Sequence, residues 1–362
     1  MAEASRKYRR LAGQVLVAGF HGQEPPDTLL RACRAGELGG VILFARNLTG
    51  DVADVAALVE RLTVAAPDPL LVSIDQEGGR VQRLRAPVLQ LPPMRVLGNI
   101  DDESLTRRAA RALGEQLALL GITTDFAPVL DVDTNPLNPI IGDRSFSRDA
   151  AAVARHGLAF AAGLSDSGVA ACGKHFPGHG DTEKDSHLDL PRIAHARDRL
   201  DAVELAPFRA ARGKLPMIMT AHVVFDAIDP GVPATLSKKV ITELLRGELA
   251  YDGVIVSDDL EMKAVADHFG VAESACAAIE AGCDVLLVCH SQERLDACRE
   301  ALALKASDDP VFARRLEEAA DRHLALRRAH RPAPETERET LLERLAAVGA
   351  ASIESEIASR HG

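Results

Sequence analysis

The sequence predicts an α/β fold: a single TIM-type (β/α)8 barrel with extra C-terminal helices. Three observations lead to this class: eight short apolar runs, helical segments between them, and long polar segments that follow the runs rather than precede them. Runs that are apolar on nearly every residue suit strands covered on both faces, as in a parallel sheet. Eight such strands alternating with about eight helices are typical of a closed barrel, and an open doubly wound sheet is the alternative.

The eight apolar runs are rich in Val, Ile, Leu and Ala, and we expect each to form one strand. In chain order they are QVLVAGF from Gln14, GGVILFA from Gly39, LLVSID from Leu70, TDFAPVLDV from Thr124, GVAACGKHF from Gly168, PMIMTAHVVF from Pro216, GVIVSDD from Gly253 and CDVLLVCH from Cys283.

The segments between the runs have apolar residues at spacings of three and four, which is typical of amphipathic helices. Clear examples are residues 51–62, 104–120 and 149–164, each with an Asp or Ser near its start that can cap the helix. From about Pro310 the chain is rich in Arg, Glu and Ala, which predicts one or two further helices. We therefore expect residues 1–309 to form the catalytic barrel and residues 310–362 to pack on it within the same domain.

Polar side chains collect where the predicted strands end. They are Asp75, Asp131, Lys174, His175, His222, Asp258, Asp259 and His290. The long segments 76–102, 133–148 and 177–197 also follow strands. Since barrels of this type keep their active sites at the carboxyl ends of the strands, the sequence predicts an active site there.

The composition narrows the class of protein further. The 362 residues are 47% hydrophobic and carry a formal charge of -11, which argues against a nucleic-acid partner because phosphate backbones need a dense basic surface. The basic start leads into an apolar run too short for a secretion signal, and no stretch approaches a membrane span, so we expect a cytoplasmic protein without a membrane partner.

The six cysteines lack a C-x-x-C spacing and are expected to be buried free thiols. We expect a monomer.

The segment Gly173–Pro191 has the densest group of reactive side chains, with three histidines in a Gly- and Pro-rich loop. A metal site built on His175, His179 and Asp181 is one interpretation, but the i, i+4 spacing of a helical zinc motif is absent. In the other interpretation Asp185 hydrogen-bonds His187 and makes it a general acid/base. A third interpretation is that His187 is an ordinary solvated loop histidine, and the local sequence alone favours this one. We expect no metal and no cofactor.

Five motifs resemble glycoside hydrolase family 3, specifically its single-domain β-N-acetylhexosaminidases of the NagZ type. They are SIDQEGGRVQRL (73–84), FAPVLDV (126–132), IGDRSFS (141–147), KHFPGHGDTEKDSH (174–187) and VSDDLEM (256–262). They occur in the family's order and span most of the predicted barrel.

The resemblance implies a role for each matching residue. Asp258, which follows a Ser, would be the catalytic nucleophile, and Asp259 would be structural. His187 would be the acid/base and Asp185 its partner. The residues expected to hold the terminal sugar are Asp75, Arg83, Arg144, Lys174 and His175.

The implied activity is hydrolysis of terminal β-linked N-acetylglucosamine with retention of configuration, through a covalent glycosyl-Asp258 intermediate. The implied substrate is a muropeptide-like carbohydrate derived from peptidoglycan, so that the enzyme would serve cell-wall recycling. The alternatives are a family 3 β-glucosidase, whose usual members carry a second sandwich domain, and an N-acetylglucosaminide phosphorylase. A metal-dependent barrel hydrolase and a non-catalytic sugar-binding protein are weaker alternatives.

Overall fold

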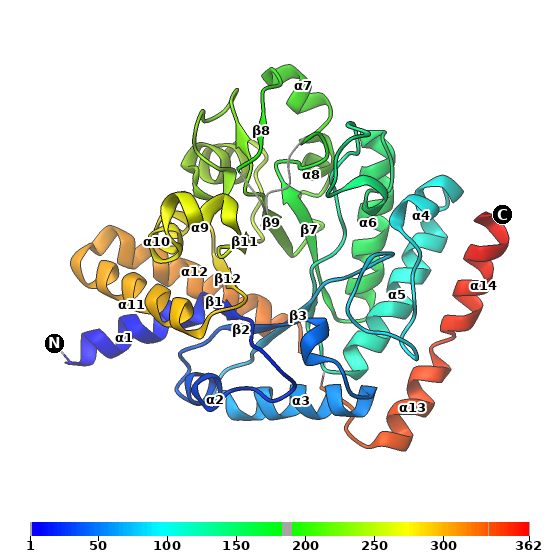
Figure 1. Cartoon of the computed structure of the whole chain (residues 1–362), viewed down its shortest axis with the longest axis horizontal. Helices are drawn as coiled ribbons and strands as arrows, with labels where there is room; N and C mark the ends of the chain where they lie inside the picture. The colour runs from blue at the N-terminus through cyan, green and yellow to red at the C-terminus, as the bar shows by residue number, and fades with distance from the viewer. Residues whose placement is uncertain (1, 183–189, 332, 362) are drawn as a thin grey trace.

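The computed structural model describes residues 2–182, 190–331 and 333–361, and a closed barrel of parallel strands lies at its centre (Figure 1). The barrel strands are β1 (Leu16–Ala18), β2 (Gly40–Leu43), β3 (Leu71–Ile74), β6 (Thr124–Asp125), β7 (Ala170–Phe176), β9 (Met217–Thr220), β11 (Val254–Asp259) and β12 (Val285–Val288). β1 pairs with both β2 and β12, which closes the sheet. The predicted barrel is therefore confirmed, and each of the eight apolar runs contains one of the barrel strands.

Helices surround the barrel on its outside, and most of them follow a barrel strand in the chain. They are α1 (Ala2–Gln14), α2 (Asp27–Arg34), α3 (Val52–Ala65), α4 (Met94–Ile100), α5 (Glu103–Leu119), α6 (Ala150–Asp166), α7 (Arg197–Ala202), α8 (Ala206–Ala210), the π-helix η4 (Lys239–Glu248), α9 (Lys263–Phe269), α10 (Val271–Ala281) and α11 (Gln292–Asp308). The side chains of Asp51, Asp102 and Asp149 accept backbone N–H groups at the starts of α3, α5 and α6. These caps satisfy amides that the first turn leaves unpaired, which explains where the three helices begin.

Short elements occupy the segments that follow the barrel strands. β4 (Gln76–Gly78) and β5 (Val81–Gln82) form an antiparallel hairpin, and β8 (Arg192–Ile193) pairs with β10 (Val224–Phe225). The single turns η1 (Ala45–Asn47), η2 (Gly142–Arg144) and η3 (Ala234–Leu236) complete this set. They give the carboxyl end of the barrel its irregular loops.

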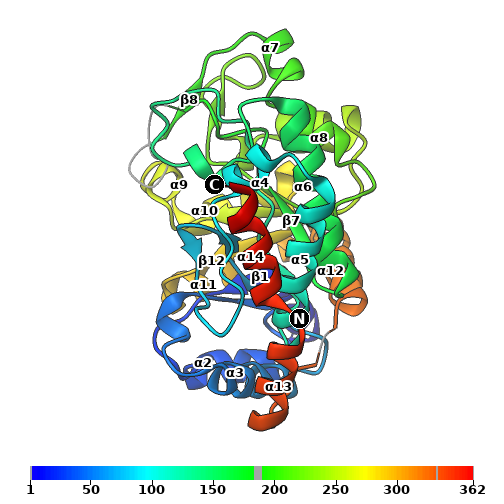
Figure 2. The same cartoon turned by 90° about the vertical axis from the view of Figure 1, so that its right-hand side faces the viewer.

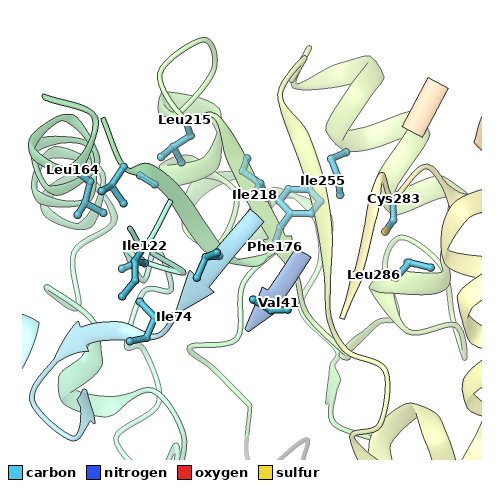
Figure 3. Packing of buried hydrophobic residues seen from close by; sticks show 14 of the residues in the cluster. Val41, Ile74, Ile122, Leu164, Phe176, Leu215, Ile218, Ile255, Cys283 and Leu286 are labelled. Carbon is cyan, nitrogen blue, oxygen red and sulfur yellow. The ribbon is translucent and has the colours of Figure 1, made fainter. Parts of the chain in front are cut away.

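Alternation along the strands divides the apolar side chains into two layers. Val254 and Val256 of β11 belong to the cluster inside the barrel, whereas Ile255 between them belongs to the larger cluster beneath the surrounding helices. Figure 3 shows part of the outer layer, where Leu164 of α6 and Ile218 of β9 are among the buried side chains. Successive residues of a strand point to opposite faces, so a strand covered on both faces must be apolar throughout.

The C-terminal segment forms three helices, where the sequence suggested one or two: α12 (Pro310–Ala329), α13 (Arg338–Ala347) and α14 (Ala350–His361). α13 packs against α5, and α14 packs against α4 and α5 (Figure 2). No helix within the described ranges is long and apolar enough to cross a membrane.

α12 has a different place from α13 and α14, because it packs against the amino end of the barrel. Its Leu326 belongs to the cluster inside the barrel, and Arg327 donates to the carbonyl of Pro69, just before β3, at 2.7 Å. His323 lies 2.8 Å from the carbonyl of Gln14, just before β1. α12 therefore closes the floor of the barrel.

Candidate active site

A pocket of about 450 Å³ opens at the carboxyl ends of the barrel strands. Six of the residues predicted from sequence line it: Asp75, Arg83, Arg144, Lys174, His175 and Asp258. They come from segments that follow β3 and β6 and from the ends of β7 and β11. The two other predicted residues, Asp185 and His187, lie outside the described residues.

A chain of charged side chains forms one wall of the pocket. Lys174 donates to Asp75 at 2.7 Å and lies 2.6 Å from Glu77, which also binds Arg144 through two contacts of 2.8 Å. Arg83 contacts Asp75 at 3.4 Å. Burial alone would raise the pKa of the Glu77 carboxyl, but the charges of Arg144 and Lys174 outweigh it and hold that pKa well below its usual range. Glu77 is therefore ionised, and the ion pairs of the wall hold donors and acceptors for sugar hydroxyls in fixed positions.

His175 is held by a buried carboxylate. Its Nδ1 lies 2.7 Å from Asp131, which also accepts the backbone N–H of His179 at 2.6 Å. Burial would raise the pKa of Asp131, but the neighbouring His175 and His179 lower it below its ordinary value. With Asp131 as the acceptor, Nδ1 of His175 is the donor of this hydrogen bond, which fixes the orientation of the ring.

The three residues considered for a metal site do not converge. His175 faces Asp131, whereas His179 Nδ1 lies 2.8 Å from the Thr182 hydroxyl, and Asp181 pairs with His195. Burial, followed by the charge of His175, lowers the pKa of His179 to about 4, which keeps its ring neutral. Within residues 2–182, 190–331 and 333–361, no group of three or more His, Cys, Asp or Glu side chains is arranged to hold a metal ion.

The two adjacent carboxylates of β11 have different surroundings. Both line the pocket, and one oxygen of Asp258 accepts the backbone N–H of Asp259 at 2.8 Å. Asp259 accepts the backbone N–H groups of Glu261 at 3.1 Å and Cys289 at 3.3 Å, and it pairs with His290 at 3.3 Å. The contacts of Asp259 are those of a residue that shapes the loop.

His222, one of the polar residues noted at the strand ends, is buried and does not line the pocket. Its Nδ1 lies 2.8 Å from the Thr235 hydroxyl, and its Nε2 lies 2.9 Å from the carbonyl of Asp259. It links β9, η3 and β11 behind the site.

Three residues in the pocket or directly behind it were not singled out from the sequence. Glu77 joins two cations in the pocket wall, as described above. Asp125 is fully buried, and burial raises its pKa to about 8, so that it is protonated at neutral pH. Phe44 stacks on His290 at the pocket edge with ring centroids 5.9 Å apart. The sequence contained a signal for each of them: Glu77 lies two residues after Asp75, Asp125 is a charged residue within an apolar run, and Phe44 lies near the end of another run.

Comparison with known proteins assigns this arrangement to a family. Residues 13–325 match the glycosyl hydrolase family 3 N-terminal domain. The chain is 43% identical over 288 residues to the β-hexosaminidase of Alkalilimnicola ehrlichii, which covers 77% of this chain and 80% of that protein.

Two solved structures are similar along most of the chain. A family 3 β-N-acetylglucosaminidase from a Paenibacillus species superposes with a TM-score of 0.87 at 43% identity, covering 94% of this chain and 68% of that one. NagZ from Neisseria gonorrhoeae, in complex with N-trifluoroacetyl-D-glucosamine, superposes with a TM-score of 0.79 at 32% identity, covering 96% and 98%.

Proposed function

The chain belongs to glycosyl hydrolase family 3 and is a β-N-acetylglucosaminidase of that family, and from this we propose that it removes terminal β-linked N-acetylglucosamine with retention of configuration. The observation that carries the proposal is the convergence of Asp75, Arg144, Lys174, His175 and Asp258 on one pocket at the carboxyl ends of the strands. Their sequence positions span most of the barrel, so their meeting is a product of the fold.

Asp258 is the proposed nucleophile. In the first step its carboxylate attacks the anomeric carbon while His187, protonated, gives its proton to the departing oxygen. A covalent glycosyl-Asp258 intermediate forms, and neutral His187 then takes a proton from water, whose oxygen displaces the carboxylate. Asp185 orients His187. The family motif gives this role to Asp258, which follows Ser257, and the contacts of Asp259 with two backbone amides and His290 suit a structural role.

The pocket wall has the chemistry of a site for an uncharged, hydroxyl-rich ring. Lys174 and Arg144 carry N–H donors, and Asp75 carries acceptor oxygens, within a group of paired charges. Paired charges present strong directional hydrogen bonds while adding little net charge. His175, held through Nδ1 by Asp131, adds an imidazole whose orientation is set before the sugar arrives.

For the natural substrate we propose a fragment of peptidoglycan in the cytoplasm, with N-acetylglucosamine at its non-reducing end. Support comes from the similarity to NagZ of Neisseria gonorrhoeae, which was solved with an N-acylated glucosamine. We expect the N-acetylglucosamine ring to be the part of the substrate that is mainly recognised, because the pocket residues named above would contact that ring.

The proposal is tested with 4-nitrophenyl N-acetyl-β-D-glucosaminide beside the matching plain β-glucoside. We expect turnover of the first to exceed that of the second strongly, and to survive exhaustive chelation. Proton NMR of the reaction should show the β-anomer of N-acetylglucosamine first, with the α-anomer appearing only by later mutarotation. The α-anomer as first product would contradict the covalent mechanism, and turnover of the plain glucoside alone would contradict the substrate.

A further inference from the structure

Glu77 is a charged residue of the pocket whose carboxylate is already occupied by protein groups. It lies on β4, two residues after Asp75, and its side chain is 2% exposed. One oxygen contacts both Lys174 Nζ and Arg144 Nη2, and the other accepts from Arg144 Nε at 2.8 Å. Both of its carboxylate oxygens are therefore engaged by the two cations expected to bind the sugar.

The number of donors on these cations shows what Glu77 does. A lysine has three N–H donors, and Lys174 gives one to Asp75 and one to Glu77, which leaves one. An arginine has five, and Arg144 gives two to Glu77 and one to the carbonyl of Ile140, which leaves two. Because the positions of the used donors are fixed, the directions of the remaining donors are fixed as well.

The charge of Glu77 is a second reason to expect that it holds these cations in place. Two carboxylates of the wall, Asp75 and Glu77, face the three cations Lys174, Arg144 and Arg83, so the wall already has one more cation than carboxylates. Without the charge of Glu77, Arg144 would lose its bidentate partner and Lys174 would keep only Asp75. The Lys174 side chain and the unpaired guanidinium of Arg144 would then adopt several orientations. Binding a sugar would restrict these orientations again, at a cost in conformational entropy.

We propose that Glu77 is a positioning residue for sugar binding, which acts by holding Lys174 and Arg144 with their remaining N–H donors directed at the substrate. This inference rests on the proposed function, because it takes Lys174 and Arg144 as sugar-binding groups.

The first test is Glu77→Gln, which keeps the shape of the side chain and removes its charge. We expect kcat/KM on the 4-nitrophenyl N-acetyl-β-D-glucosaminide to fall about 10- to 100-fold, the range for a charge-assisted hydrogen bond. Most of the loss should appear as a higher KM, and the inhibition constant of N-acetylglucosamine should rise in parallel, because the lost effect concerns binding of the sugar.

Asp284→Asn is the matched control. Asp284 is also fully buried and held by arginines, with contacts of 2.5 Å to Arg246, 2.6 Å to Arg315 and 2.7 Å to Arg322, but it lies before β12 at the other end of the barrel. Both substitutions should lower Tm, whereas only Glu77→Gln should change KM. An equal rise of KM in both variants would overturn the proposal, since it would show a general effect of losing a buried carboxylate.

A double-mutant cycle with Arg144→Ala separates positioning from an independent role. If Glu77 acts through Arg144, then Glu77→Gln costs clearly less in the Arg144→Ala background than in the native chain. Strictly additive losses would overturn the proposal. Should Glu77→Gln fail to fold, Glu77→Asp replaces it in the same cycle, where coupling or additivity again decides. An inactive native protein would instead overturn the proposed function, so the two failures are distinguishable.

Discussion

Asp125→Asn should remove one component of the pH dependence of stability. In the native protein one carboxyl oxygen of Asp125 accepts the backbone N–H of Gln76 at 2.9 Å, and the other is buried without a hydrogen-bond partner among the described residues. Burial raises the pKa from 3.8 to about 8, so between these values the folded protein holds a proton that the unfolded chain has released. Stability must then fall as the pH rises, by about 1.36 kcal/mol for each pH unit.

Between pH 5 and pH 7 the native protein should therefore lose about 2.7 kcal/mol through this residue alone. An asparagine in the same place has no proton to hold, and its carbonyl oxygen can still accept from Gln76. A buried amide that lacks a partner shifts the stability by an amount independent of pH, so only the slope carries the signal.

The assay is urea unfolding of both proteins at several pH values in this range. The difference in unfolding free energy, variant minus native, should rise in favour of the variant by about 2.7 kcal/mol from pH 5 to pH 7. A difference that stays constant across the range would refute the reasoning, because it would mean that Asp125 has the same charge in the folded and unfolded chains.

Four further outcomes can be measured. Asp258→Asn should remove nearly all turnover while the matched Asp259→Asn keeps much of it, and more than a few percent of activity in a correctly folded Asp258 variant would contradict the assignment. His187→Ala should lower kcat/KM about 10²- to 10⁴-fold for an alkyl glycoside and less for a nitrophenyl glycoside, whose leaving group hardly needs a proton; equal losses would contradict the acid/base role. Asp185→Asn should move the alkaline limb of the pH–rate profile to lower pH, and an unchanged limb would show that the pair does not interact. Leu326→Ala should cost about 2–5 kcal/mol in urea unfolding, because it leaves a cavity at the floor of the barrel, whereas a loss typical of surface sites would mean that α12 does not close the barrel.

The arrangement of strands and helices was predictable from the sequence because the signals for it are local. Residues 254–256 are apolar on both faces of the strand, which is typical of a strand covered on both sides. The start of α3 was visible in the same way, since Asp51 caps amides only two and three residues away. The resemblance to a family then indicated six residues that the structure places in one pocket.

The sequence by itself therefore determined the barrel, the end of the barrel that carries the site, and the residue types available there. Only the tertiary structure decided which charges pair, because Glu77, Arg144 and Lys174 lie up to 97 residues apart and meet only when the barrel closes. It also decided that Asp125 is neutral, since the pKa of a carboxyl depends on its burial and neighbours rather than on its sequence context. The position of Leu326 inside the barrel could also be known only from the structure. Helical periodicity shows that a helix has an apolar side, but only the packing shows which surface that side covers.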